Sequence, residues 1–364
     1  MSKTPPVPPY PPYTFEAVRE PQAPRVSAAA SQTWAEAEEP VAPDATPDEC
    51  LRHAVRTAVL APSVFNSQPW AFQARGGGAL DLLADRTRGL PALDPDGRLL
   101  TVSCGAALFL LRIGAARNGL RLRVRPVPDL GRPDLLATVD VVPGPPDPAL
   151  LALAPAVAAR RTHRGAFERR PVPADVVAAL VREAQGEGAA FLRAPDGLAA
   201  LVAEATEWLG ADEASRQEFA AWLRPSRTPA EAPVTDGVPD YAAGEWDARS
   251  YTTGGDDFLV SWGEGRAENE RRLAADAPVA LVLVTEADNP FEWLAAGQAH
   301  ARAFLQATLL GVATSYLLGP VLVPGVRDRL SDALGGLWPQ VVVRAGYATT
   351  GAPTPRRPLS AVLR

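Results

Sequence analysis

Residues 61–70, APSVFNSQPW, gather polar side chains at a predicted break between a helix and a strand. Pro62 has no backbone N–H and disfavours helical geometry at Ala61, so the preceding helix should end there. Ser63 and Asn66 can hydrogen-bond nearby backbone or a ligand. A polar break between two buried elements indicates the edge of a binding crevice. An ordinary helix-to-strand loop is the alternative interpretation.

Two arginine clusters lie far from this loop in the sequence. The segment RRTHR contains Arg160, Arg161, Thr162 and Arg164, and the C-terminal segment PRRP contains Arg356 and Arg357. Guanidinium forks and hydroxyl donors suit the binding of a phosphate group. For each cluster taken by itself, solvated surface charge is an equally ordinary interpretation.

Apolar periodicity and end signals predict the elements that must position these residues. Thr46, followed by Pro47, Asp48 and Glu49, is typical of a helix start. The predicted helices cover residues 46–61, 102–119, 149–160, 174–185, 195–209 and 293–311. The predicted strands cover residues 70–74, 80–84, 120–126, 136–142, 189–193, 278–285 and 337–347, with a turn at 316–320.

Two long helices rich in small residues resemble each other. Gly105 and Gly119 in CGAALFLLRIGAARNGLRLRV are spaced like Gly297 and Gly311 in AGQAHARAFLQATLLGVATSY. In each copy the helix ends at a glycine and leads into a strand or turn. This echo predicts an internal duplication, although two alanine-rich helices can also agree by chance.

Composition narrows the class of protein. The net charge of −6 and pI near 5.3 argue against a nucleic-acid partner. No apolar run spans a bilayer without a charge or proline, and the N-terminus lacks the apolar stretch of a signal peptide, so we expect no membrane partner. The two cysteines form no CxxC pair, and a reducing cytoplasm is the simplest compartment. The three histidines are far apart in sequence, so we predict no metal site.

Three regions follow from these boundaries. Residues 1–45 are rich in proline and are predicted to be a mostly disordered tail; the alternative is an arm anchored by aromatic residues such as Trp34. Residues 46–148 form a first half and residues 149–364 a second half. Within the second half, residues 224–268 are long and irregular, which indicates a lid, an Ω-loop or disorder.

The loop at 61–70 resembles the APSxxNxQPW motif of the FMN-dependent nitroreductase family, in which this loop lies beside the flavin. The first half holds this motif, while the second half holds RRTHR and PRRP, so the two halves together complete one flavin site. This division resembles the Acg-type nitroreductase-like proteins of actinobacteria, which are single-chain pseudo-dimers. The resemblance implies an α+β nitroreductase-like fold: two pseudo-symmetric halves, each a mixed β-sheet packed by helices, plus a lid insertion.

The resemblance also implies which residues hold FMN. Arg160 and Thr162 match positions that hold the phosphate, and Arg164 matches a position near the pyrimidine edge of the ring. A C-terminal basic position that also grips the phosphate corresponds to Arg356 or Arg357. From the first half Pro62, Ser63 and Asn66 would meet the flavin, and the backbone of Leu318, Gly319 and Pro320 would face it near N5.

The implied activity is hydride transfer through FMN, with NAD(P)H as the possible reductant and a small aromatic or conjugated molecule as the substrate. No catalytic side chain is assigned, because the flavin carries the chemistry, and a chain of two halves can act as a monomer. The long segment at 224–268 departs from compact nitroreductases and contains several aromatic residues. A tight lid would instead make the protein a flavin-binding or flavin-sequestering one. Removal of residues 1–45 should leave flavin binding intact, since the motifs lie beyond them.

Overall fold

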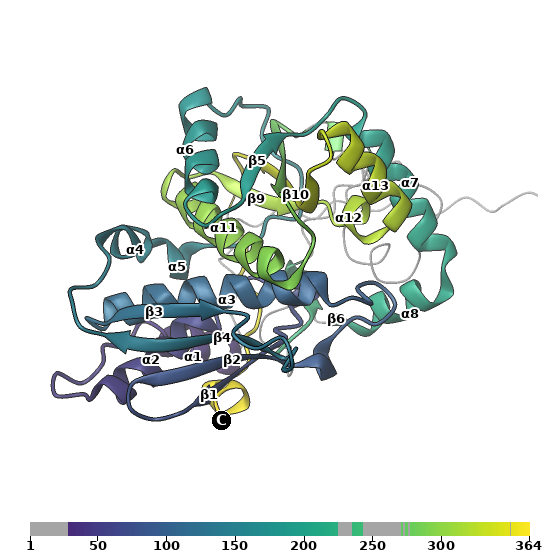
Figure 1. Cartoon of the computed structure of the whole chain (residues 1–364). Helices are drawn as coiled ribbons and strands as arrows, with labels where there is room; N and C mark the ends of the chain where they lie inside the picture. Colours follow the sequence, from purple (N-terminus) through teal and green to yellow (C-terminus); the bar gives the residue numbers. More distant parts are fainter. Residues whose placement is uncertain (1–27, 225–234, 243–270, 272–273, 276, 350) are drawn as a thin grey trace, which may run out of the picture.

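The computed structural model describes residues 28–224, 235–242, 271, 274–275, 277–349 and 351–364. Two four-stranded sheets flank a central pair of long helices, α3 (Arg98–Arg117) and α11 (Pro290–Leu309) (Figure 1). Helix α3 packs on the first sheet, α11 packs on the second, and the two helices pack on each other. The small side chains and glycines of both helices allow this close approach.

The first half builds its sheet in the order β1-β2-β4-β3, with every neighbouring pair antiparallel. Helix α2 precedes β1, and α3 lies between β2 and β3. Its elements are α2 (Pro47–Ala58), the 3-10 turn η1 (Val64–Asn66), β1 (Trp70–Ala74), β2 (Ala79–Ala84), the 3-10 turn η2 (Arg86–Arg88), α3, β3 (Arg121–Pro126) and β4 (Leu135–Val142).

The second half builds its sheet in the order β5-β8-β10-β9, again antiparallel throughout. Its elements are α4 (Pro148–Leu153), α5 (Ala156–Ala159), α6 (Ala174–Gln185), β5 (Ala190–Arg193), α7 (Leu198–Ala211), α8 (Glu213–Ala221), β6 (Leu223–Arg224), β7 (Val238–Pro239), η4 (Asp240–Ala242), β8 (Val279–Thr285), α11, β9 (Ala313–Tyr316), α12 (Gly319–Leu322), α13 (Pro324–Ala333), β10 (Trp338–Gly346) and α14 (Leu359–Val362).

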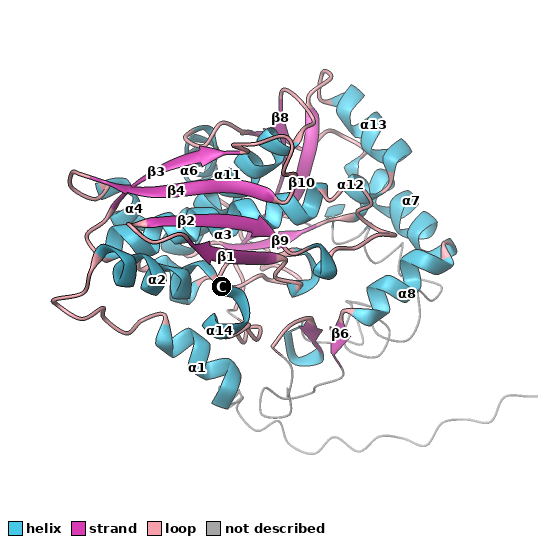
Figure 2. Cartoon of the chain, turned by 60° about the horizontal axis from the view of Figure 1, so that its bottom comes forward, coloured by secondary structure: helices cyan, strands magenta, loops and turns pink. Residues whose placement is uncertain are grey.

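The two halves repeat one topology. If β1, β2, β3 and β4 are matched with β5, β8, β9 and β10, the strand orders are identical, and α3 and α11 each precede the third strand of their half. The α+β fold with two pseudo-symmetric halves is therefore confirmed. The expected mixed pairing is not found within the two four-stranded sheets; in the part of the chain that the structure describes, parallel pairing to their strands occurs at two single bridges, Phe72 with Leu363 and Thr162 with Thr314. Through the first of these, the C-terminal segment of the second half reaches the sheet of the first half (Figure 2).

The two matched glycines meet where the central helices cross. A Cβ added to Gly105 would lie 2.2 Å from the Leu294 carbonyl oxygen and 2.9 Å from the Gly297 Cα. A Cβ on Gly297 would lie 2.0 Å from the Val102 carbonyl oxygen and 2.8 Å from the Gly105 Cα. The reciprocity of these contacts is that of a two-fold interface, here within one chain. Both positions require glycine because backbone fills the space of any side chain.

Local signals explain where elements begin and end. The predicted helix start is confirmed: Thr46 and Glu49 form a reciprocal capping box. Helix α3 begins at Arg98, four residues before the predicted start at Val102, because the Asp94 carboxylate accepts the backbone N–H groups of Leu99 and Leu100 at 3.0 and 2.8 Å. The helix predicted over 149–160 is divided into α4 and α5 at Pro155, whose ring interrupts the hydrogen-bond ladder.

The N-terminal region differs from the expectation of a disordered tail. Residues 28–36 form α1 (Ala28–Glu36), and Trp34 and Ala37 are buried in the core of the first half. The arm interpretation, with Trp34 as an anchor, therefore holds for this part. The physical reason is a long-range contact that local composition does not show: the Trp34 indole N–H donates to the Thr354 carbonyl at 3.1 Å. Residues 1–27 lie outside the described range.

The structure contains several elements that the sequence did not predict. Helices α8 and α13 and strand β9 were not predicted, and β9 occupies the start of the expected turn at 316–320. Most of the predicted lid at 224–268 lies outside the described residues; within it, β7 pairs in parallel with β6. Among the described helices, α3 alone is long and apolar enough to span a membrane by length and composition, but 94% of its apolar window is buried inside the fold.

Candidate functional site

The loop between α2 and β1 has an unusual backbone. Phe65, Asn66 and Gln68 adopt φ values of 49°, 56° and 53°, in the left-handed region that residues other than glycine rarely occupy. Such a conformation costs about 1–3 kcal/mol per residue and persists only where the surroundings enforce it. Clustered strain of this kind is characteristic of functional segments, so the loop predicted to edge a crevice is held in a specific shape.

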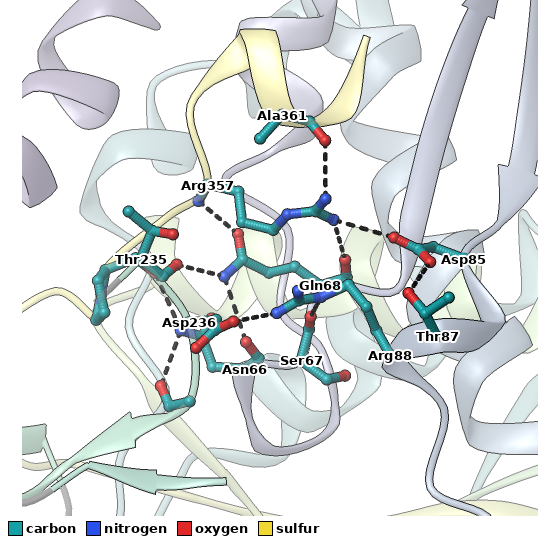
Figure 3. Close-up of polar contacts among 12 residues, drawn as sticks. Asn66, Ser67, Gln68, Asp85, Thr87, Arg88, Thr235, Asp236, Arg357 and Ala361 are labelled. Carbon is teal, nitrogen blue, oxygen red and sulfur yellow. Dashed lines mark hydrogen bonds and ion pairs between the residues drawn. The ribbon is translucent and has the colours of Figure 1, made fainter. Parts of the chain in front are cut away.

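Contacts from distant parts of the chain hold this shape (Figure 3). The Gln68 side-chain amide donates to the Thr235 carbonyl at 2.8 Å, and its Oε1 accepts the backbone N–H of Arg357 at 2.8 Å. The Arg88 guanidinium pairs with Asp236 beside them. The loop of the first half is therefore fastened by two segments of the second half.

The RRTHR segment lies next to this loop. A single parallel bridge places Thr162 beside Thr314 of β9, and the following N–H, that of residue 163, donates to the Thr314 carbonyl at 2.8 Å. Arg160 is 3% exposed; its guanidinium contacts the Thr162 hydroxyl and the Leu60 carbonyl, each at 3.4 Å. The basic segment of the second half thus meets the end of the first helix of the first half.

Arg356 reaches the same place from the C-terminus. Its side chain is 1% exposed and donates to the Asn66 Oδ1 at 2.8 Å and to the Leu60 carbonyl at 3.3 Å. Since Arg160 and Arg356 both donate to the Leu60 carbonyl, their guanidinium groups lie within reach of one oxygen. We call Arg160, Arg164 and Arg356 the arginine cluster.

The positive charges of the arginine cluster are buried and have no carboxylate beside them among the described residues. Burial lowers the pKa of Arg160 and lowers that of Arg164 to about 10; burial and the charges of the other arginines hold the pKa of Arg356 well below its ordinary value. Within the described ranges, no carboxylate forms an ion pair with any of the three, and the buried Nε atoms of Arg160 and Arg356 have no hydrogen-bond partner. Buried positive charge without a counter-charge is costly, so the cluster predicts a bound anion.

A cavity opens beside the arginine cluster and is lined by both halves. Ser63 lines it from the first half and Arg164 from the second, so the loop and the basic segment share one cleft. Thr162, Arg164 and His300 group around Tyr316 in the lining, and we call these four residues the polar end. The other polar residues of the lining are Ser63, Ser103, Thr206, Ser315 and Arg344. Its remaining walls are mostly apolar, and include Pro62, Val64, Phe65, Leu93, Leu99, Val102, Val202, Leu209, Phe219, Val238, Leu317, Leu318, Leu322 and Val341. An apolar slot with polar groups at one end suits a flat ligand that carries an anionic tail.

His300 and Tyr316 form a hydrogen-bonded pair at the polar end. The His300 Nε2 lies 2.6 Å from the Tyr316 hydroxyl, and its buried Nδ1 has no partner. Burial and the Arg160 charge lower the pKa of His300 to about 3, so the ring is neutral at neutral pH. An unpaired buried N–H costs more than an unpaired acceptor nitrogen, which assigns the proton to Nε2. The Tyr316 hydroxyl then accepts from His300 and keeps its own proton for donation, and the Thr162 hydroxyl, which also lines the cavity, is within hydrogen-bond reach of it.

The structure separates the residues expected at the site into two sets. Those that line the cavity are Pro62, Ser63, Thr162, Arg164, Leu318 and Gly319. Those that do not are Asn66, Arg160, Pro320, Arg356 and Arg357. The Asn66 side-chain nitrogen donates to the Gly237 and Pro355 carbonyls, and its oxygen accepts from Arg356. Asn66 therefore contacts the arginine cluster and not the cavity.

Arg357 points away from the cavity. Its guanidinium donates to the Gln68 carbonyl at 3.1 Å and the Ala361 carbonyl at 2.8 Å, and lies 3.6 Å from the Asp85 carboxylate. Of the two C-terminal arginines between which the sequence did not decide, Arg356 alone belongs to the arginine cluster.

The sequence pattern of the Nitroreductase family matches residues 157–347, which begin just before RRTHR and end after β10. This match covers more than half of the chain. The chain belongs to the nitroreductase family. Family membership supports an oxidoreductase class of activity.

Curated relatives extend the likeness across both halves. The chain is 34% identical over 331 residues to "Putative NAD(P)H nitroreductase Rv3131" of Mycobacterium tuberculosis H37Rv, covering 88% of this chain and 92% of that protein. It is 28% identical to the protein named "Putative NAD(P)H nitroreductase acg" of the same organism, covering 86% and 95%. Among solved structures, a nitroreductase with bound FMN from Bacteroides fragilis NCTC 9343 is 18% identical with a TM-score of 0.34, covering 56% of this chain and 92% of that one.

The nitroreductase motifs did not indicate every residue at the cavity. His300 and Tyr316 carried no motif, because their pairing depends on the packing of α11 against β9. The walls formed by Val202, Thr206 and Leu209 are spaced as one face of α7, a signal that the sequence does contain. In the described part of the chain, no group of three or more His, Cys, Asp or Glu side chains is arranged to hold a metal.

Proposed function

We propose that this nitroreductase-family chain binds one FMN between its two halves and uses it to pass hydride from NAD(P)H to a small aromatic or conjugated substrate. The observation that carries the proposal is the arginine cluster: buried guanidinium groups that have no carboxylate partner among the described residues, beside a largely apolar cavity that both halves line. A phosphate dianion supplies the missing negative charge, and a flat ring fits the apolar walls. FMN combines these two features.

Each part of FMN would contact a different group of residues. Arg160 and Arg356 would neutralise the phosphate, and the Thr162 and Tyr316 hydroxyls would donate hydrogen bonds to it or to the adjoining chain of the cofactor. Arg164 lines the cavity and would favour negative charge on the ring edge next to it. Leu318 and Gly319 place backbone at the cavity wall, and Pro62 and Ser63 close the opposite side. Bound FMN supplies two-electron chemistry that needs no protein nucleophile and no metal.

The duplicated topology supports a further part of the proposal. Dimeric nitroreductases bind flavin at the interface between subunits, as the family resemblance implies, and here the α3–α11 crossing provides such an interface within one chain. We infer that the protein functions as a monomeric pseudo-dimer. A cytoplasmic location is included in this proposal, and the two cysteines, which are buried and unpaired, accord with a reducing compartment.

A second candidate function is flavin sequestration, with FMN shielded from ordinary NAD(P)H turnover. The described part of the predicted lid favours it: Val238 lines the cavity, and the Ala242 carbonyl accepts from Arg164 at 2.9 Å. Gly237 exchanges hydrogen bonds with Asn66 on the opposite side, at 3.2 and 3.0 Å. Residues 235–242 thus contact both halves at the site. The aromatic residues expected to complete a lid, Trp246, Tyr251, Phe258 and Trp262, lie outside the described range.

The visible spectrum of the purified protein, followed by anaerobic mixing with NADPH or NADH, tests both candidates. We expect flavin absorbance and its prompt bleaching, which supports turnover. Stable absorbance after mixing, with normal bleaching by dithionite, supports sequestration. A colourless protein that fails to bind added FMN would contradict both.

A further inference from the structure

The N-terminal arm contacts the arginines behind the cavity. Trp34 of α1 is 9% exposed, and its ring lies under two guanidinium groups, with the Arg161 and Arg356 Cζ atoms 4.6 and 5.2 Å from the ring centroid. Arg356 belongs to the arginine cluster, and Arg161 is the neighbour of Arg160 in RRTHR. A residue more than 120 positions away in sequence therefore supports both basic segments at once.

An aromatic partner stabilises these arginines without neutralising them. A cation over an indole face is favoured by about 0.5–2 kcal/mol, depending on how far it is desolvated. A carboxylate in the same place would pair with Arg356 and compete with an incoming anion. Because the indole carries no charge, the guanidinium keeps its full positive charge for a ligand. Within the described ranges, neither arginine forms an ion pair with a carboxylate, which agrees with this division of roles.

Trp34 also fixes the backbone that carries Arg356. Its indole N–H donates to the Thr354 carbonyl at 3.1 Å, and the Thr354 hydroxyl accepts a hydrogen bond from the Arg356 guanidinium. The ring and the N–H thus act on one short segment, the first on the charge and the second on the main chain. Arg356 is in turn held to Asn66 of the strained loop.

The arm has other attachments that do not involve Trp34. Arg56 pairs with Glu39 at 2.8 Å, and Arg117 pairs with Glu38 at 3.1 Å and donates to the Ala37 carbonyl at 3.3 Å. These contacts lie on α2 and α3, away from the arginine cluster. The arm can therefore remain docked when the Trp34 ring is removed, which allows the contribution of the ring to be measured by itself.

We propose that Trp34 is a positioning residue for the phosphate end of the site, and that the arm carrying it determines how tightly the phosphate group of the cofactor is retained. This inference rests on the proposed function, because it takes FMN as the anion. It reverses the expectation from the sequence that residues 1–45 can be removed without effect on flavin binding.

The experiment compares FMN with riboflavin, which has the same ring and no phosphate. Apoprotein prepared from the full chain is titrated with each ligand by flavin fluorescence or calorimetry, at a temperature well below unfolding. We expect Trp34→Ala to weaken FMN binding about tenfold, chiefly through faster dissociation, and to leave riboflavin binding within about twofold. Trp34→Phe keeps a ring and loses the indole N–H, so its FMN affinity should lie between the two proteins.

A matched control is Trp338→Ala, which removes another tryptophan with an arginine over its ring, Arg327 at 5.4 Å, away from the arginine cluster. Its ratio of FMN to riboflavin affinity should equal that of the unmodified protein. Equal weakening of FMN and riboflavin by Trp34→Ala, or no weakening of either, would overturn the inference. If Trp34→Ala does not fold, the same comparison with Trp34→Phe decides it. Failure of the unmodified protein to bind FMN would overturn the proposed function as well.

Discussion

The two halves of the molecule share a frame and differ at the positions that face the site. Aligned through Gly105 with Gly297 and Gly119 with Gly311, Leu108 corresponds to His300 and Val124 corresponds to Tyr316. Leu108 is fully buried in the core of the first half, while His300 and Tyr316 line the cavity. The same helix and strand therefore carry apolar residues of the core in one half and a hydrogen-bonded polar pair in the other.

The remaining site features are divided in the same way. The first half supplies a strained loop, and the second half supplies the arginine cluster and the segments that hold the loop. Topology therefore provides two equivalent places for a site, and among the described residues the polar side chains and the arginine cluster gather at the one formed by α11 and β9. Substitutions in the shared frame should affect stability, and substitutions at the unequal side chains should affect the binding of the ligand.

The shared frame depends first on the helix crossing. Gly105→Ala should lower the free energy of unfolding by about 3 kcal/mol, because the new methyl group would meet backbone atoms of α11 that cannot move aside. Gly325→Ala in α13 is the matched control; nothing lies within 4 Å of its added Cβ, and alanine there should be neutral or slightly stabilising. Urea denaturation measures both, and equal effects would show that the crossing is not as close as described.

The arginine cluster should carry most of the affinity for the anion. Arg356→Ala should weaken FMN binding by one to two orders of magnitude, because it removes a buried positive charge beside the cavity and interactions with charged groups contribute about 1.5–3 kcal/mol. Arg160→Ala should do the same. Arg357→Ala removes a neighbouring arginine that contacts Gln68, Asp85 and Ala361, and should change FMN affinity by less than about threefold. A larger loss of FMN affinity in Arg357→Ala than in Arg356→Ala would show that the phosphate does not bind at the arginine cluster.

The His300 position should make stability depend on pH. The pKa of His300 is lowered to about 3 in the folded protein from an ordinary value of 6.5. The unfolded chain therefore binds more protons between these values, and stability present above pH 6.5 is lost as the pH falls toward 3. From this group we expect a loss of about 2 kcal/mol between pH 7 and pH 5.

His300→Leu, which installs the residue found at the equivalent position in the first half, should remove that part of the pH dependence. Denaturant unfolding at several pH values measures it, and His53→Leu provides a comparison at a less buried histidine. An unchanged pH slope in His300→Leu would mean that the ring is not held neutral in the folded state.

The smallest effect is expected at the Tyr316 hydroxyl. Tyr316→Phe should weaken FMN binding about five- to tenfold, because one hydrogen-bond donor is lost while the ring is kept. Tyr347→Phe, at a tyrosine outside the cavity lining, should have no effect on the affinity. Unchanged FMN affinity in Tyr316→Phe would indicate that the hydroxyl does not donate into the cavity, contrary to the tautomer assigned to His300.

Local signals in the sequence were sufficient for much of the frame. The capping box at Thr46, the small residues of the long helices and the apolar strands gave element types and an order close to those observed, and the matched glycines indicated the repeat. The boundaries failed where a capping side chain outside the apolar run decides them, as at Asp94, or where a proline interrupts an apolar run, as at Pro155.

The site could be predicted only where a motif marked it. The loop at 61–70 and the RRTHR segment carried family signatures, and the structure brings them to one cleft. Nothing local separates Arg356 from Arg357, since their directions depend on Asn66 and Gln68 across the molecule. Trp34 was missed as a site residue for the same reason, because its partners Arg161 and Arg356 are far away in sequence. His300 and Tyr316 were missed because their pairing depends on how α11 packs against β9.

The most direct test of one shared site is the stoichiometry of FMN binding to the apoprotein, measured by calorimetric titration together with the mass of the protein in solution. The account predicts one FMN for each monomeric chain. Two FMN per chain would mean that the first half completes a site of its own, and one FMN for every two chains would mean that the interface forms between molecules; either result would contradict it.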